Sequence, residues 1–294
     1  MPSQSLPLND GRALEIFSNA ASVSQAIVFH HGTPAHATIW KRWLEYLEAR
    51  NVFAISYSRA GYGQSSRDIG RSVIDVADDI DQTLEHFGVK SFVSIGASGG
   101  GPHALADSTN AKCRGIITLA GVGAYGQSDL EFLAGMGVEN YEEFGAAVTG
   151  IETLTSWMEA NAGSHTYVTG KEIIAAFGGL ISQPDKDLLT AEYAEEIATQ
   201  MRLALSTGYF GWFDDDLAFV RGWGFDLSKI SQPVSIWQGD QDFMVPAAHG
   251  SWLQSIIPGS ELVLQSGEGH LSLKEHCKDE IIETALAMLR GATN

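Results

Sequence analysis

The sequence predicts an α/β protein whose mostly parallel central sheet is covered by helices on both faces. Up to residue 121, short apolar segments typical of buried strands alternate with segments of helical periodicity, and the same alternation resumes near Pro233. This alternation favours a parallel sheet, because each helix that connects two parallel strands has to pack back on the sheet. With 294 residues, of which 44% are hydrophobic, the chain can bury a large core.

Each expected strand is a short apolar run of the kind found in buried strands. The runs lie at residues 26–29, 52–57, 91–95, 116–119, 233–237 and 261–264. Between the second and the third run, residues 72–87 carry the apolar stripe of an amphipathic helix. Ser72 and Asp75 have the spacing of a capping box at its start, and Gly88 marks its end.

The strand pattern disappears between residues 122 and 225, where helical stretches separated by Gly, Ser and Pro take over. These stretches lie at residues 140–148, 151–160, 171–180 and 190–206. We therefore expect residues 1–121 and 226–294 to form the α/β core, and residues 122–225 to form a helical insertion.

The most informative motif is Gly96-Ala97-Ser98-Gly99-Gly100, which follows an expected strand directly and precedes a helical stretch. A serine between small residues at a strand-to-helix turn is the pattern of a nucleophile elbow. The turn strains the serine backbone, and the glycines let strand and helix approach closely. The Ser98 hydroxyl would then project above the sheet, beside backbone N–H groups that point at developing negative charge. Ser98 is the candidate nucleophile.

A serine hydroxyl becomes a good nucleophile only when a base takes its proton and a third group orients that base. After an elbow of this kind, the partners are expected in the order serine, acid, histidine, each following a later strand. The loop at residues 239–246 follows such a strand and contains both Asp240 and Asp242. Asp240 also suits an ordinary turn, so Asp242 is preferred as the acid.

The candidate base is His270, in the loop Ser266-Gly267-Glu268-Gly269-His270 that follows the last expected strand. Two glycines in this loop allow His270 to reach the edge of the sheet before the final helix begins. His249 and His276 fall on helical patterns, where partly exposed or structural histidines are the simpler interpretation.

With these motifs in the required order, the chain resembles the α/β-hydrolase fold superfamily from about residue 25 to its C-terminus. His30-His31-Gly32-Thr33-Pro34 is similar to the superfamily's H-G-x-P oxyanion loop. Residues 58–65 resemble its D-x-P-G-Y-G-x-S loop, although Ser58 and Ala60 replace the usual Asp and Pro.

The resemblance implies roles for three further positions. The backbone N–H groups of Thr33 and Gly99 would form the oxyanion hole. The superfamily pattern G-x-x-D-x-x-V-P fits residues 239–246 and places the acid at Asp242. The insertion at 122–225 stands where the superfamily commonly places a cap over the active site.

The expected cap is rich in aromatic residues, especially between Tyr209 and Phe225. Most of them are expected to form the cap's own core, while Trp212 and Phe213 are the candidates for contact with an apolar substrate group. Asp214-Asp215-Asp216 is expected at a helix N-terminus, where the helix dipole favours acids. One of the three could alternatively bind a cationic substrate group, as acidic cap residues do in proline iminopeptidases.

The composition excludes several classes of binding partner. The formal net charge of −18 argues against nucleic acid and anionic membranes. The two cysteines, Cys113 and Cys277, are too few and too far apart in the sequence to predict a disulfide framework or a metal site. The sequence shows neither a secretory signal nor an apolar stretch long enough to span a membrane. A cytoplasmic enzyme that acts on a small molecule without metal or organic cofactor is expected, and a homo-oligomer is compatible with the sequence.

The expected activity is that of a serine hydrolase that cleaves a carboxylic ester through an acyl-enzyme. The same three residues also suit thioester, amide, lactone or carbon–carbon bond hydrolysis, including an activity like that of proline iminopeptidases, because fold does not decide among them. A different class of function is a small-molecule receptor that keeps the three residues without turnover.

Overall fold

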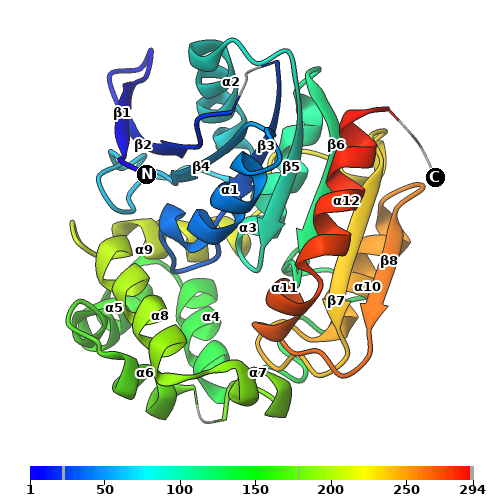
Figure 1. Cartoon of the computed structure of the whole chain (residues 1–294). Helices are drawn as coiled ribbons and strands as arrows, with labels where there is room; N and C mark the ends of the chain where they lie inside the picture. The colour runs from blue at the N-terminus through cyan, green and yellow to red at the C-terminus, as the bar shows by residue number, and fades with distance from the viewer. Residues whose placement is uncertain (22–23, 178, 292–294) are drawn as a thin grey trace.

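The computed structural model describes residues 1–21, 24–177 and 179–291, and within them it forms one eight-stranded sheet with helices on both faces (Figure 1). The strand order is β1-β2-β4-β3-β5-β6-β7-β8. Strands β3 to β8 are parallel, whereas β1–β2 and β2–β4 pair antiparallel. The predicted α/β class with a mostly parallel sheet is confirmed. The strands are Gln4–Pro7 (β1), Ala13–Ser18 (β2), Gln25–His30 (β3), Ala54–Ser58 (β4), Ser91–Ala97 (β5), Cys113–Leu119 (β6), Val234–Gly239 (β7) and Glu261–Gln265 (β8).

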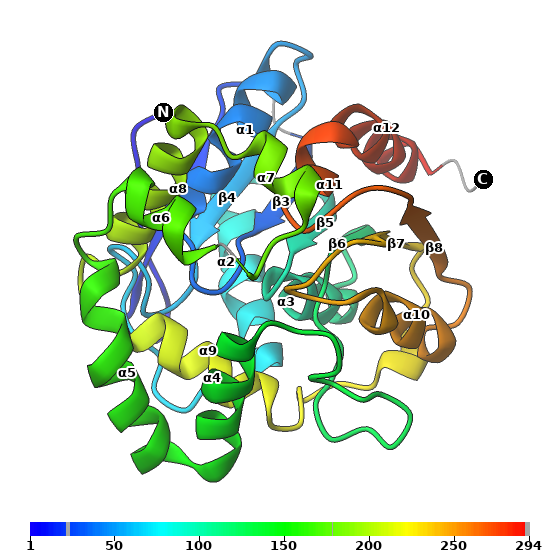
Figure 2. The same cartoon turned by 90° about the horizontal axis from the view of Figure 1, so that it is seen from below.

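Helices cover the two faces of the sheet in two layers (Figure 2). On one face lie α1 (Lys41–Glu48), α11 (Ser272–His276) and α12 (Lys278–Leu289), whose apolar residues pack with Phe29, Val93 and Ile117 of the sheet. On the other face lie α2 (Val76–Phe87), α3 (Gly100–Ala106) and α10 (Ala247–Ile256). Because both faces are covered, β4 and β7 are buried at every position and β5 at every position but its last, with no alternation between buried and exposed residues.

The helix expected at residues 72–87 begins as a short 3₁₀ turn and continues as α2. Ser72 and Asp75 form the predicted capping box, and Gly88 ends the helix in the left-handed conformation at φ 69°. The 3₁₀ turns of the described residues are Ala37–Trp40 (η1), Val73–Asp75 (η2), Asp107–Thr109 (η3) and Leu227–Lys229 (η4).

The β1–β2 hairpin was not predicted from the sequence, where the first expected strand begins at residue 26. Its turn contains Asp10-Gly11, with Gly11 at φ 90°, and an Asp-Gly pair between two apolar runs is a hairpin signal that could have found it. The apolar pattern is weak, because only Leu6 of β1 is buried. Among the described residues β1 is the edge of the sheet and pairs with β2 alone.

Between β6 and β7 the chain leaves the sheet and forms a helical insertion beyond the carboxyl ends of the parallel strands (Figure 1). Its helices pack around two apolar clusters of their own, one near Met158 and Trp212, the other near Ile173 and Ala198. Four of them match expected stretches, α7 was not expected, and α9 begins before the helix start that was expected at residues 214–216. They are Val138–Thr149 (α4), Ile151–His165 (α5), Gly170–Ala176 (α6), Gln183–Leu188 (α7), Ala191–Ala204 (α8) and Phe210–Phe219 (α9).

The boundaries at residues 121/122 and 225/226 stay a prediction. Residues 22–23, 178 and 292–294, which the predicted ranges include, lie outside the described part of the chain. None of the helices in the described part is both long and apolar enough to cross a lipid bilayer.

The strand register brings several loops to one edge of the sheet. His30 of β3 pairs with Gly96 of β5, and Ala97 pairs with Leu119 of β6. Leu119 in turn pairs with Trp237 of β7. The loops after β3, β5, β7 and β8 therefore emerge together at the carboxyl ends of the strands, next to the insertion.

Candidate active site

Ser98 forms a strained turn between β5 and α3. Its φ is +53°, in the left-handed region that costs a residue other than glycine about 1–3 kcal/mol. The neighbouring glycines make the turn possible, because a Cβ on Gly96 would lie 2.1 Å from the Gly100 carbonyl oxygen. A Cβ on Gly100 would lie 2.4 Å from the carbonyl oxygen of His30. The turn thus has the geometry that the elbow motif predicts.

Asp242 and His270 meet across the loops after β7 and β8. His270 Nδ1 lies 2.8 Å from Asp242 Oδ2. The other carboxylate oxygen, Oδ1, accepts the N–H groups of Met244 at 2.9 Å and Val245 at 2.8 Å, which orients the buried carboxylate. Because a carboxylate only accepts hydrogen bonds, Nδ1 carries the proton and Nε2 is left with its lone pair.

Asp240 has a different environment from Asp242. Its side chain accepts the Ser266 hydroxyl at 3.0 Å and the Gly267 N–H at 2.8 Å, and it is exposed. These contacts join the loops after β7 and β8 but do not reach His270. The structure therefore brings Asp242, and not Asp240, to the imidazole.

The described residues contain no hydrogen bond between Ser98 and His270. Both residues lie at the same edge of the sheet, and Leu273, three residues after His270, belongs to the apolar cluster that also contacts Ala97 of the elbow and contains Ala120, which follows β6. In ligand-free enzymes the hydrogen bonds of a catalytic base are often long and tighten only when substrate binds.

Thr33 and Gly99 lie side by side next to Ser98. A Cβ on Gly99 would stand 2.4 Å from the Thr33 hydroxyl oxygen, and a Cβ on Gly32 would stand 3.4 Å from the Ser98 Cβ. The two residues expected to form the oxyanion hole are thus adjacent: Thr33 lies in the loop after β3, and Gly99 stands at the start of α3.

A buried carboxylate of the insertion holds the Thr33 side chain. Asp215 of α9 accepts the Thr33 hydroxyl at 2.5 Å and the Tyr62 hydroxyl at 2.8 Å. It also forms ion pairs of 2.6 Å with Arg59 and with Arg71. Burial would raise the pKa of Asp215, but the charges of Arg59 and Arg71 outweigh burial and hold this pKa well below its usual range. The carboxylate is therefore charged at neutral pH.

Arg59 extends this network to the backbone of the oxyanion loop. Its guanidinium donates to the carbonyl oxygens of His31 and of Gly32, and to the Thr33 hydroxyl at 3.0 Å. The backbone N–H of Arg59 in turn donates to the His31 ring. The sequence singled out residues 58–65 as a loop but indicated no role for Arg59, because the partners of its guanidinium come from distant segments.

The expectation that Asp214-Asp215-Asp216 begins a helix is wrong: all three lie inside α9 and are buried. Helix α9 already begins at Phe210, so the three acids fall after its first turn. Asp214 pairs with Arg67 at 2.7 Å, which leaves Asp216 next to Glu143 of α4. Burial, and then the charge of Glu143, raise the pKa of Asp216 well above its usual range. A carboxyl kept neutral offers a hydrogen bond rather than a negative charge.

Trp212 and Phe213 lie in the apolar cluster of the insertion. The Trp212 ring packs edge-on against Trp157, and its Nε1 donates to Glu143 at 2.6 Å. The Phe213 ring lies 5.6 Å from the guanidinium of Arg67. Packing accounts for both side chains, and their expected contact with substrate stays a prediction.

Two further histidines, His30 and His249, are buried and hydrogen-bonded. His30, the last residue of β3, lies 2.9 Å from Asp107 and 2.8 Å from Tyr57. His249, expected on a helix surface, is buried instead, because its ring accepts the Gly123 N–H at 3.0 Å. Burial lowers the pKa of His249 to about 4.

Comparison with known proteins gives the family. A model of the alpha/beta hydrolase family matches residues 27–284. This chain belongs to that family. A non-heme haloperoxidase from Rhodococcus erythropolis is 32% identical over 88 residues, which are 30% of this chain and only 32% of the haloperoxidase.

Solved structures share the fold of this alpha/beta hydrolase over almost its whole length. An esterase from Exiguobacterium antarcticum has a TM-score of 0.73 at 18% identity, with 98% of this chain and 100% of the esterase covered. An enol-lactonase from Burkholderia xenovorans has a TM-score of 0.68 at 15% identity, with 98% and 100% covered. At these identities the likeness shows the fold alone.

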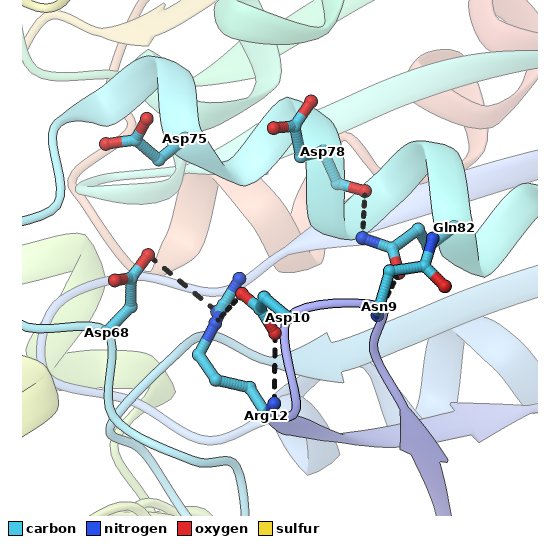
Figure 3. A pocket seen from close by; sticks show the side chains of 7 residues that line it. All are labelled: Asn9, Asp10, Arg12, Asp68, Asp75, Asp78 and Gln82. Carbon is cyan, nitrogen blue, oxygen red and sulfur yellow. Dashed lines mark hydrogen bonds and ion pairs between the residues drawn. The ribbon is translucent and has the colours of Figure 1, made fainter.

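A hollow elsewhere on this alpha/beta hydrolase lies between the β1–β2 turn and α2 (Figure 3). Arg12 in it is paired with Asp10 and Asp79, each at 2.6 Å. None of the residues that line the hollow is a Ser, Cys or His, so it offers no nucleophile. Within the described residues, no group of three or more His, Cys, Asp and Glu side chains could hold a metal ion. The hollow is lined by Asn9, Asp10, Arg12, Asp68, Asp75, Asp78 and Gln82.

Replacement of each loop aspartate by Asn, one at a time, tests which of the two orients His270. We expect Asp242→Asn to lower kcat for ester hydrolysis by about 10⁴-fold, because an amide favours the wrong imidazole tautomer. Asp240→Asn, which removes the same charge two residues away, should leave kcat near that of the wild type. Steady-state kinetics on p-nitrophenyl acetate measures both, and a damaging Asp240→Asn beside a harmless Asp242→Asn would contradict the assignment.

Neutralising Asp215 should destabilise the fold. Asp215→Asn leaves two buried guanidinium groups without their counter-charge, and breaking a buried ion pair costs about 3–5 kcal/mol. Asp214→Asn is the matched control, because its partner Arg67 is partly exposed and keeps contact with water. Urea unfolding at equilibrium should show a clearly larger loss for Asp215→Asn. Equal losses in the two variants would mean that the Asp215 network does not stabilise the fold.

Proposed function

We propose that this alpha/beta hydrolase is a serine hydrolase that cleaves a carboxylic ester of a small molecule. The observation that carries the proposal is the strained Ser98 turn at the same sheet edge as the Asp242–His270 pair. A strained backbone, a bonded acid–imidazole pair and adjacent N–H donors are the parts that acyl transfer needs. The family supports a hydrolase, and two fold neighbours are described as esterases, one of them from Thermogutta terrifontis.

The first half of the reaction forms an acyl-enzyme. Ser98 Oγ attacks the carbonyl carbon while His270 Nε2 takes its proton, and Asp242 stabilises the imidazolium through Nδ1–H. The carbonyl oxygen becomes negative and accepts the N–H groups of Gly99 and Thr33. When the tetrahedral intermediate collapses, His270 returns the proton to the leaving alcohol.

The second half releases the acid. A water molecule gives its proton to His270 and attacks the acyl carbon, and the oxyanion hole again holds the developing charge. The bond to Ser98 Oγ breaks, and His270 protonates the departing serine. The Arg59 and Asp215 contacts fix the backbone of the oxyanion loop before substrate arrives, so the donors need no rearrangement at the moment of reaction.

The pH dependence follows from His270. Burial lowers the pKa of His270, but the charge and the hydrogen bond of Asp242 outweigh burial, so the pKa lies above the ordinary histidine value. Only neutral His270 accepts the serine proton, so kcat/KM should fall as pH decreases through a midpoint above about 6.5. A pH profile on p-nitrophenyl acetate measures the midpoint. A midpoint well below 6 would contradict this environment.

Replacement of the nucleophile is the decisive test. Ser98→Ala should lower kcat by about four to six orders of magnitude with the fold intact, because residues of such a unit act together. Circular dichroism checks folding, and Ser251→Ala, an exposed serine of α10 whose hydroxyl bonds only locally to the Ala247 carbonyl oxygen, is a control outside the elbow. Activity retained in Ser98→Ala would end the covalent mechanism. Negligible turnover by the wild type on ester, thioester, amide and lactone substrates, together with tight ligand binding, would favour a receptor instead.

A further inference from the structure

Asp185 of α7 lies against the loop that carries His270, although α7 belongs to the insertion and His270 follows β8. The Asp185 side chain is fully buried. Its Oδ2 accepts the backbone N–H of His270 at 2.9 Å. Its Oδ1 accepts the N–H groups of Leu271 and Ser272, each also at 2.9 Å. One carboxylate therefore binds three consecutive backbone donors, beginning with that of His270.

These three N–H groups precede or open α11, and a helix leaves its first N–H groups without partners of its own. Leu271 stands at the N-cap position of α11 and has no side-chain oxygen to accept them. Asp185 supplies the missing acceptor from 85 or more residues away in the chain. Hydrogen bonds to a charged acceptor are about twice as strong as neutral ones, so the contact defines where the His270 backbone lies.

The absence of a side chain at Gly269 allows the same contact. A Cβ at this position would lie 2.4 Å from Asp185 Oδ2 and 2.4 Å from the hydroxyl oxygen of Ser182, the residue before α7. No other residue type would let the start of α7 approach the histidine loop so closely. Gly269 thus allows the insertion to pack closely against the loop that carries His270.

We propose that Asp185 is a positioning residue for His270: it fixes the backbone of the histidine loop, while Asp242 fixes the imidazole ring. The inference rests on the proposed function, in which His270 must present Nε2 to Ser98. With its backbone and ring both bonded to carboxylates, His270 keeps its orientation through the reaction. A misplacement of about 1 Å at such a group can cost about 100-fold in rate.

Asp185 also contributes to the electrostatic environment of His270. Burial lowers the pKa of His270, the charge and hydrogen bond of Asp242 raise it, and the charge of Asp185 raises it further. Lys274 of α11 acts in the opposite direction. Removal of the Asp185 charge should therefore lower the pKa of His270.

The test compares Asp185→Asn with Asp187→Asn in the full chain. Asp187 lies in the same short helix and is exposed, and its carboxylate accepts the Gln183 side-chain amide at 2.6 Å, so its substitution removes the same charge without touching the histidine loop. For Asp185→Asn we expect kcat on p-nitrophenyl acetate to fall roughly 10- to 100-fold with little change in KM. We also expect the acid limb of the pH profile, and the titration of the His270 ring measured by NMR, to move to lower pH. Asp187→Asn should match the wild type in all three.

Three outcomes would overturn the proposal or separate it from the proposed function. If Asp185→Asn matched Asp187→Asn in kcat and in the His270 titration, Asp185 would not position His270. If the wild type cleaved no ester, the proposed function would fail, while the NMR titration would still test Asp185. If Asp185→Asn did not fold, amide exchange of the wild type decides. The N–H groups of His270, Leu271 and Ser272 should exchange as slowly as those inside α12, and exchange typical of an open loop would refute the contact.

Discussion

The buried carboxylate of Asp215 is the interaction on which the arrangement of the site depends. Two guanidinium groups and the Thr33 hydroxyl share it, and removal of the carboxylate would leave both buried guanidinium groups without a counter-charge. Arg59 carries the constraint on to the carbonyl oxygens of His31 and Gly32. The position of α9 in the insertion and the shape of the loop after β3 are therefore coupled by one ion-pair network, which includes the Thr33 side chain that lies beside Gly99.

The insertion contacts the core through a second buried aspartate, which also accepts hydrogen bonds from a loop of the core. Asp185 binds the backbone of the histidine loop, as Asp215 binds the oxyanion loop. In both places a charged acceptor satisfies donors that a loop could not satisfy internally, and the cost of leaving such donors unpaired keeps the segments together. A helical insertion tied in this way does more than cover the edge of the sheet, because it supports two of the loops from which acyl transfer would be carried out.

Much of the fold and the candidate site could be predicted from local sequence, because the relevant signals are local. The six apolar runs became β3 to β8, and their register alone brings the loops with Ser98, Asp242 and His270 to one edge. The elbow was predictable since its strain requires glycines at neighbouring positions. The β1–β2 hairpin was not, because a short edge strand buries too few residues to show an alternating pattern.

The sequence pattern was sufficient to predict the parallel sheet and to single out Ser98 and His270 as candidates, since each of these signals depends on residues close together in the sequence. It preferred Asp242 to Asp240, and the partners of the two carboxylates in the folded chain explain the difference. The roles of Asp185, Arg59 and Asp215 emerged only on folding. Their partners lie 26 to 182 residues away in the chain, and a charged side chain in a sequence looks the same whether water or a buried counter-charge will surround it. Burial decides between these cases, and burial is a property of the packed molecule.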